Sequence, residues 1–140
     1  MAKVVVVSGG FDPIHSGHIA YFRAAKELGD ILIAGVNSDA WLTRKKGKPF
    51  MPFADRYMVV SSIRYVYYAM AFNDDDDSAI DLLEKVKIHW ADDKIIVANG
   101  GDRNYGNNRE ISVTGVEFVY GVGGSMKMNS SSDILKAWKE

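Results

Sequence analysis

Two apolar runs near the N-terminus most constrain what this chain can fold into. Residues 3–8 contain four consecutive valines, and residues 31–36 form a second apolar run. Unbroken apolar runs of this length are typical of strands buried on both faces of a parallel sheet. Between them, apolar residues recur at helical spacing from Ile19 to Leu28, and Gly29 ends the segment. The pattern predicts a right-handed βαβ unit whose first loop lies at the carboxyl edge of the sheet, where ligands bind.

Similar patterns predict the remaining elements. Further strands are expected at 68–72, 94–98 and 116–120, and helices at 39–43, 54–68 and 78–86, with a last helix containing Ile134, Leu135 and Trp138. Asp39 and Ser78 are the expected N-caps of two helices, and residues 44–48 and 74–77 are expected to be solvated loops. The fold class is therefore α/β, a Rossmann-like three-layer sandwich with a mostly parallel five-stranded sheet, in one domain spanning 1–140.

Composition excludes several classes of protein. The 140 residues include 17 Lys+Arg, 18 Asp+Glu and no cysteine, which excludes disulfides, thiolate metal sites and cysteine nucleophiles. Balanced charge argues against a nucleic-acid partner, because coating a polyanion requires an excess of cations. No apolar run approaches the ~20 residues that span a bilayer, and Met1 leads into the first strand without a cleavage site. We expect a cytoplasmic protein without a membrane partner.

The segment from Gly9 to His18, GGFDPIHSGH, carries the chemistry. His15 and His18 are three residues apart where the first loop becomes a helix, so both imidazoles lie on one helical face beside unpaired backbone N–H groups. Gly17 between them lets a ligand approach the backbone. The arrangement predicts a polyphosphate site. Two alternatives are a helix-capping or surface role for the histidines and a zinc pair, for which only His89 remains as a third imidazole.

At these residues the chain resembles the nucleotidylyltransferase superfamily defined by HxGH. Within it, the chain is similar to the cytidylyltransferase-like group that contains glycerol-3-phosphate cytidylyltransferase and the heptose-1-phosphate adenylyltransferase domain. The similarity continues, in order, through Leu28-Gly29-Asp30, Val36-Asn37-Ser38-Asp39, Asp55-Arg56, Ile63-Arg64-Tyr65-Val66, Gly100-Gly101-Asp102 and Ser130-Ser131-Ser132. It therefore covers nearly the whole chain.

The resemblance implies transfer of CMP or AMP from CTP or ATP to a small sugar or polyol phosphate, with release of pyrophosphate. It also implies Mg²⁺ bound with the NTP, rather than at a protein metal site, and a homodimer to which Phe50, Phe53, Tyr57 and Tyr65 contribute unless they only pack in the core. The acceptor phosphate is already ionised at neutral pH, so catalysis can rest on positioning and charge stabilisation.

The resemblance also assigns roles to individual residues. The implied catalytic residues are His15, His18, Lys45, Lys46 and Arg64. The implied nucleotide-binding residues are Gly9, Gly10, Phe11, Asp12, Gly17, Gly100, Gly101, Asp102, Arg103, Lys127, Ser130, Ser131 and Ser132. Asp39 is the implied substrate-binding residue, although a turn or capping role fits Asp12 and Asp39 equally well. Lys48 is as well explained by solvation, and Arg56 by tying its helix to a neighbouring loop.

Two departures from the glycerol-phosphate pattern leave the base open. Arg103 stands where that pattern has the second Asp of Asp-Asp-Trp, and Lys127 takes the place of an arginine shortly before the serines. The double glycine and the Asn-Ser-Asp segment favour the heptose-type adenylyl enzymes. The altered tail also leaves open a nucleotide-binding module without turnover.

A calcium site is not expected, although residues 73–84 place oxygen ligands at several EF-hand positions. Ser78 replaces the required glycine, and the segment follows a strand rather than a helix.

Overall fold

The computed structural model describes residues 1–101, 105–123 and 131–139. A five-stranded sheet forms its centre, in the order β3-β2-β1-β4-β5. The strands are β1 (Lys3–Gly9), β2 (Ile31–Val36), β3 (Tyr68–Ala71), β4 (Lys94–Ala98) and β5 (Glu117–Val119). Every pairing in this sheet is parallel, so the expected α/β fold with a Rossmann-like parallel sheet is confirmed.

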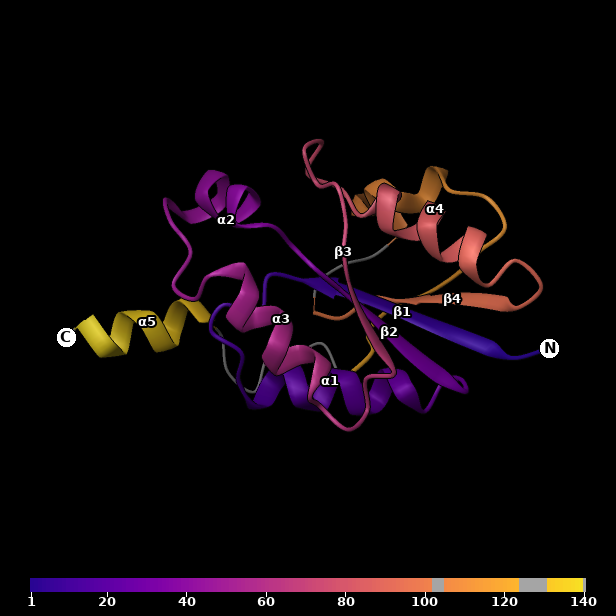
Figure 1. The fold of residues 1–140 in the computed structure, drawn as a ribbon, viewed down its shortest axis with the longest axis horizontal. Helices are drawn as coiled ribbons and strands as arrows, with labels where there is room; N and C mark the ends of the chain where they lie inside the picture. Colours follow the sequence, from indigo (N-terminus) through magenta and orange to yellow (C-terminus); the bar gives the residue numbers. More distant parts are fainter. Residues whose placement is uncertain (102–104, 124–130, 140) are drawn as a thin grey trace.

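The helices cover the two faces of the sheet. They are α1 (Ser16–Lys26), α2 (Asp39–Lys46), α3 (Phe53–Ser61), α4 (Ile80–His89) and α5 (Ser131–Lys139), with short 3₁₀ turns at Tyr105–Asn107 and Arg109–Ser112. Figure 1 shows α1 and α3 on one face and α4 on the other, with α2 and α5 at the end of the sheet where the strands finish. None of the described helices is long and apolar enough to cross a membrane.

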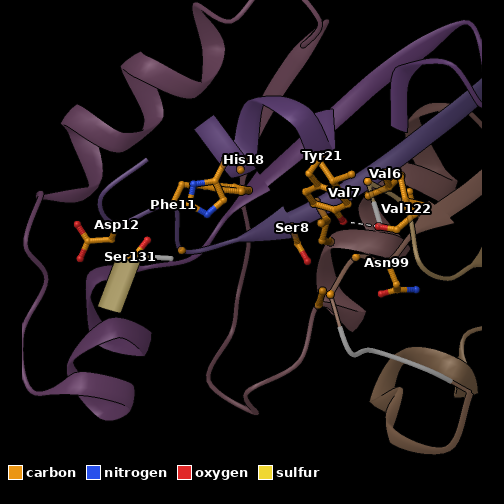
Figure 2. A pocket seen from close by; sticks show the side chains of 18 of the residues that line it. Val6, Val7, Ser8, Phe11, Asp12, His18, Tyr21, Asn99, Val122 and Ser131 are labelled. Atoms are coloured by element: carbon orange, nitrogen blue, oxygen red, sulfur yellow. Dashed lines mark hydrogen bonds between the residues drawn. The ribbon is translucent and has the colours of Figure 1, made fainter. Parts of the chain in front are cut away.

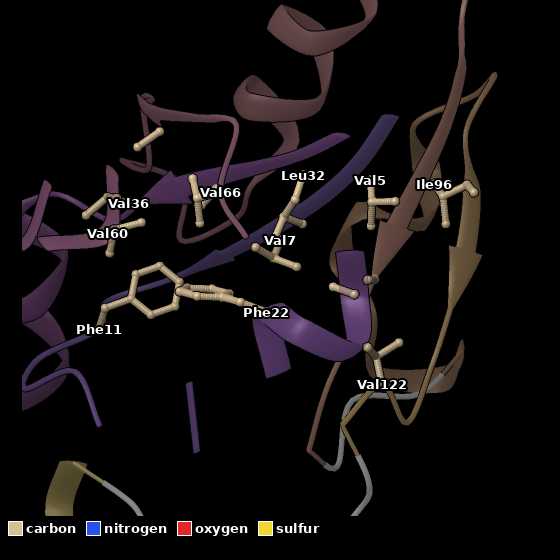
Figure 3. Close-up of a cluster of buried hydrophobic side chains, with 14 residues drawn as sticks. Val5, Val7, Phe11, Phe22, Leu32, Val36, Val60, Val66, Ile96 and Val122 are labelled. Carbon is tan, nitrogen blue, oxygen red and sulfur yellow. The ribbon is translucent and has the colours of Figure 1, made fainter. Parts of the chain in front are cut away.

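Strand alternation divides the core into two clusters. Val5 and Val7 face α1 and α3 (Figure 3), whereas Val4 and Val6 face α4, and all four side chains are at most 1% exposed. Successive side chains point to opposite faces of a strand, so both faces of β1 must be apolar. This accounts for the valine run.

The connectivity places a crevice at the end of β1. The chain leaves β1 through α1 to β2 on one side, and β4 pairs with β1 on the other side. The carboxyl ends of β1 and β4 therefore flank the point where the strand order reverses, which is where open parallel sheets bind ligands.

Several boundaries differ from the sequence-based expectation. The helix expected at 54–68 ends at Ser61, because the chain turns there to enter β3. Val66 is still buried, but it lies in the loop before β3 rather than in the helix. Arg44 to Lys46 form the last turn of α2 rather than a loop. Ser38, not Asp39, is the N-cap of α2, since the Ser38 hydroxyl accepts from the Trp41 amide.

The loop before α4 is also more ordered than expected. The helix begins at Ile80, and its N-cap Ala79 has no side chain that could accept a hydrogen bond, so Ser78 is not the cap. The buried Ser78 hydroxyl nevertheless accepts from the Ile80 amide at 3.3 Å, and it donates to Asp76 at 2.8 Å. Because this polar contact holds the loop from within, residues 74–77 are not a purely solvated segment.

Asp74 anchors this loop to the start of α2. Its carboxylate, 2% exposed, accepts hydrogen bonds from Asn37 Nδ2, the Ser38 amide and the Ser38 hydroxyl at 2.7–3.0 Å. Burial acts to raise the pKa of Asp74, but these hydrogen bonds outweigh it and hold the pKa below its usual value. The carboxylate thus fixes the helix that carries Lys45 and Lys46.

We predict that Asp74→Asn lowers the free energy of unfolding by about 1–3 kcal/mol, because the amide cannot accept all three bonds and leaves buried donors unpaired. Urea denaturation at pH 7 measures the change. The matched control is Asp75→Asn on the neighbouring exposed side chain, which should stay within about 0.5 kcal/mol of the wild type. Equal effects of the two substitutions would contradict the anchoring role.

Candidate active site

A cavity of about 470 Å³ opens at the carboxyl ends of β1 and β4. Figure 2 shows Phe11, Asp12 and His18 at one part of its wall, Tyr21 and Asn99 at another, and Ser8 between them. The predicted site residues that line it are Gly10, Phe11, Asp12, His15, Gly17, His18, Lys45, Lys46, Gly100, Gly101, Ser131 and Ser132. The structure therefore brings together predicted residues from four separate segments of the chain.

The two histidines form the N-terminal cap of α1. His15 is the N-cap, and its Nδ1 accepts from the Gly17 amide at 3.0 Å. His18 Nδ1 accepts in return from the His15 amide at 3.1 Å, and the two rings stand 3.9 Å apart. The capping interpretation and the polyphosphate interpretation are therefore compatible, because capping occupies only Nδ1 of each ring.

This capping fixes which nitrogen carries the proton. A neutral imidazole has one N–H donor and one acceptor. Since Nδ1 accepts a backbone N–H in both rings, each neutral ring carries its proton on Nε2. Burial, and to a smaller degree His15, lower the pKa of His18 to about 4. At neutral pH, His18 is thus an uncharged Nε2–H donor at the cavity wall.

Phe11 holds an unusual backbone conformation beside the histidines. Its φ is +53°, a left-handed value that costs a residue with a Cβ about 1–2 kcal/mol. Its ring is 4% exposed and packs edge-on against His18 and Phe22, with centroids 5.2 and 5.1 Å away. Gly9, which does not line the cavity, makes room for that ring, since a Cβ on Gly9 would lie 3.0 Å from it.

Asp12 organises the loop rather than pointing a free carboxylate into the cavity. The side chain is buried, and its two oxygens accept from the Phe50 and Met51 amides at 2.7 and 2.6 Å. Lys46 Nζ lies 2.7 Å from Asp12 Oδ2 and also donates to the Asp12 carbonyl. The turn alternative left open for Asp12 is the one that these contacts favour.

Lys45 reaches the cavity from α2 beside Trp41. Its Nζ lies 4.7 Å from the centre of the Trp41 ring, and both side chains line the cavity. A cation over an indole face is attracted to the ring. Lys45 and Lys46 thus both line the cavity, with Lys46 paired to Asp12 of the loop after β1.

A buried arginine holds the loops of the site together. Arg56 is 0% exposed and donates to the carbonyls of Met51, Gly10 and Asn37 at 2.7–2.9 Å. Its Nη2 also binds Asp39 Oδ1 at 2.7 Å. Arg56 therefore ties α3 to the loops after β1 and β2, and Asp39 is its ion-pair partner rather than a residue of the cavity wall.

Arg64 and Lys48 lie away from this cavity. Arg64 is exposed on the loop before β3 and contacts Tyr65, whose hydroxyl accepts from Arg64 Nη2 at 3.0 Å. Lys48 is exposed beyond the end of α2. The predicted site residues Asp102, Arg103, Lys127 and Ser130 lie outside the described residues.

The N-terminus of α5 reaches the HxGH loop. Ser131 Oγ donates to the Pro13 carbonyl at 2.8 Å, and Ser132 lines the same cavity. The contact spans most of the chain length, so it closes the cavity between the first and last segments of the sequence.

Sequence reasoning missed five polar or aromatic wall residues: Ser8, Tyr21, Trp41, Asn99 and Glu110. Tyr21 could have been found, since it lies one helical turn after His18 on the same face; its hydroxyl donates to the Ala98 carbonyl. Nothing in the local sequence marks Asn99, which follows β4 and enters the wall only through the sheet order.

Comparison with known proteins now identifies the family to which this fold belongs. The family model described as cytidylyltransferase-like matches residues 6–134. The chain belongs to the cytidylyltransferase-like family. The resemblance drawn from the HxGH motif is therefore confirmed at the level of the family.

Relatives and solved structures agree with this family. The chain is 42% identical over 87 residues to the bifunctional protein HldE of Campylobacter concisus, covering 61% of this chain and 18% of that protein. It is 33% identical over 145 residues to HldE of Geobacter metallireducens, covering 99% of this chain and 28% of that protein. The chain thus spans less than a third of these relatives.

The crystal structure of a lipopolysaccharide core biosynthesis protein from Thermoplasma volcanium has the same fold. It superposes with a TM-score of 0.65 at 24% identity, covering 86% of this chain and 96% of that one. At this level of identity, the likeness supports the fold alone.

We predict that Arg56→Lys lowers the free energy of unfolding by about 3 kcal/mol, because one ammonium cannot replace a planar fork of donors that binds four acceptors. Arg23→Lys, on the exposed face of α1, is the matched control and should change it by less than about 0.5 kcal/mol. Chemical denaturation of both variants measures the difference. A loss for Arg56→Lys no larger than for the control would refute the clamp.

Proposed function

We propose that the chain transfers a nucleoside monophosphate from CTP or ATP to a small sugar or polyol phosphate and releases pyrophosphate. The observation that carries this proposal is the pair of imidazoles whose Nδ1 atoms are used in capping, so that their Nε2–H groups serve the cavity. An uncharged pair of donors, two lysines and a helix N-terminus together suit the α-phosphate of an NTP.

In the proposed reaction, an oxygen of the acceptor phosphate attacks the α-phosphorus. A new P–O bond forms as the bond from the α-phosphorus to the bridging oxygen breaks, and that oxygen leaves with pyrophosphate. No proton must be removed from the acceptor, because its phosphate is ionised at neutral pH. His15 and His18 donate to the α-phosphate oxygens as negative charge shifts there, and Lys45 and Lys46 neutralise charge on the leaving phosphates.

Mg²⁺ is proposed to arrive bound to the NTP. Among the described residues, no group of three or more His, Asp or Glu side chains is placed to hold a metal ion, and the Asp12 carboxylate is already engaged by two amides and Lys46. Mg²⁺ commonly binds through substrate phosphates with few protein ligands. When bound, Mg²⁺ would offset negative charge on the triphosphate. The roles proposed for His15, His18, Lys45 and Lys46 do not depend on it.

The nucleotide base, the acceptor phosphate, the oligomeric state and the cellular location are also proposals. The HldE relatives and the Gly100-Gly101 pair favour the heptose-type adenylyl side of the resemblance. Of the residues considered for a homodimer, Phe53, Tyr57 and Tyr65 pack partly buried against the core, whereas Phe50 is 51% exposed beside Trp138. A cytoplasmic homodimer therefore stays a prediction.

The direct test is pyrophosphate release with CTP and ATP, each offered glycerol 3-phosphate, glucose 1-phosphate and a heptose 1-phosphate. His15→Ala and His18→Ala should each lower the rate about 100-fold or more, because each removes a donor to the developing charge. His89→Ala, on the exposed end of α4, is the control and should keep the wild-type rate. Near-wild-type turnover by either motif variant would contradict the proposed roles.

Nucleotide binding without turnover on every acceptor would instead favour the alternative, a binding module of the same fold.

A further inference from the structure

Phe11, the aromatic residue of the GGFDP segment, has a strained backbone conformation that ligand binding does not explain. Phe11 adopts a backbone φ of +53°, which residues other than glycine rarely adopt, and its ring is nearly fully buried. A ring so buried offers a ligand almost no surface, although the resemblance counts Phe11 among the nucleotide-binding residues. Backbone strain at a site persists when the surrounding structure enforces it, and it points to a function for the strained residue.

The ring of Phe11 is held from two directions. It lies over Gly9, where a Cβ would come within 3.0 Å of its Cε1 and Cζ atoms. Phe22 of α1 packs against it edge-on at 5.1 Å, and Figure 3 shows the two rings side by side in the core. The ring therefore has one position available.

That position places the ring edge-on to the imidazole of His18, 5.2 Å away with the planes at 86°. His18 is thus bounded by the Phe11 ring and by the tilted His15 ring. Its Nδ1 faces the His15 amide, which leaves Nε2 as the nitrogen that can serve the cavity.

We propose that Phe11 is a positioning residue for catalysis: its ring, locked over Gly9, holds the His18 imidazole in the capping orientation and shields it from water, so that His18 presents Nε2–H to the phosphates. This inference rests on the proposed function for the role of His18 in turnover. The placement of the ring rests on the contacts alone.

The shielding has a consequence for pH. Burial is the larger cause of the lowered pKa of His18, and His15 is the smaller. The other ionisable groups on the described cavity wall are Lys45, Lys46, Asp12, Tyr21 and Glu110, and none of them is a cause of this shift. A protonated His18 would carry hydrogen on both nitrogens, so it could not accept from the His15 amide, and the capping box would break.

The test substitutes the ring in two ways. Phe11→Leu removes the aromatic edge while keeping an apolar side chain, and Gly9→Ala displaces the ring without changing any polar group. Phe72→Leu is the matched control, because Phe72 is equally buried in the cluster on the other face of the sheet. For all variants, the pKa of His18 is measured by NMR titration that extends below pH 4. The pH profile of kcat is recorded separately, between pH 5 and 8.

We expect the pKa of His18 to rise from about 4 toward 6.5 in both site variants, with kcat roughly tenfold lower at pH 8 and KM for the NTP little changed. Their kcat should also fall more steeply than the wild-type kcat as the pH drops below about 6.5, because His18 then gains a proton in addition to the acceptor phosphate. Phe72→Leu should leave the pKa, kcat and pH profile at wild-type values.

An unchanged His18 pKa in both site variants would overturn the positioning role. A raised KM with an unchanged kcat would overturn it too, because Phe11 would then be a residue that contacts the ligand. If none of the proteins turns over, the titration still decides the placement of His18, and only the proposed function fails. Should Phe11→Leu not fold, Gly9→Ala carries the same comparison.

Discussion

The architecture of the site depends on one buried guanidinium. Arg56 has no solvent exposure and spends its hydrogen-bonding capacity on the carbonyls of Gly10, Asn37 and Met51 and on the Asp39 carboxylate. A buried charge is tolerated only when such partners surround it. These carbonyls come from the loops after β1 and β2 and from the segment before α3. By binding all of them, the Arg56 guanidinium also fixes the position of the loops that form the cavity wall.

Within that frame, the HxGH turn uses the Nδ1 atoms of its histidines for structure, and the proposed function assigns the chemistry to their Nε2 atoms. The Nδ1 atoms of His15 and His18 cap α1, which satisfies backbone donors that every helix N-terminus leaves open. The same bonds decide the tautomer, so the fold prepares the donors before a ligand arrives. Donors fixed in advance need no reorganisation during reaction, which is the basis of electrostatic stabilisation of a transition state.

Much of this follows from the sequence, for identifiable reasons. The valine run of residues 3–8 required apolar surroundings on both faces, and the strands and their parallel arrangement followed from that. Local patterns did not reveal interactions between distant segments. Asp74 resembled a solvated acid in a run of four aspartates, and only its contacts with Asn37 and Ser38 show it to be buried. Likewise, Arg64 matched a family position, yet the early end of α3 leaves it on the exposed surface, away from the cavity.

The central claim is that the Nε2–H groups of His15 and His18 bind the α-phosphate of an NTP. The most direct measurement is ¹⁵N NMR of the histidine side chains during titration with α,β-methylene CTP and α,β-methylene ATP, which cannot react. The account predicts that both rings are Nε2–H tautomers at pH 7 and that both Nε2 signals shift as one of the analogues binds, while the exposed His89 is unaffected. Nδ1–H tautomers, or saturable binding that leaves both Nε2 signals in place, would contradict it.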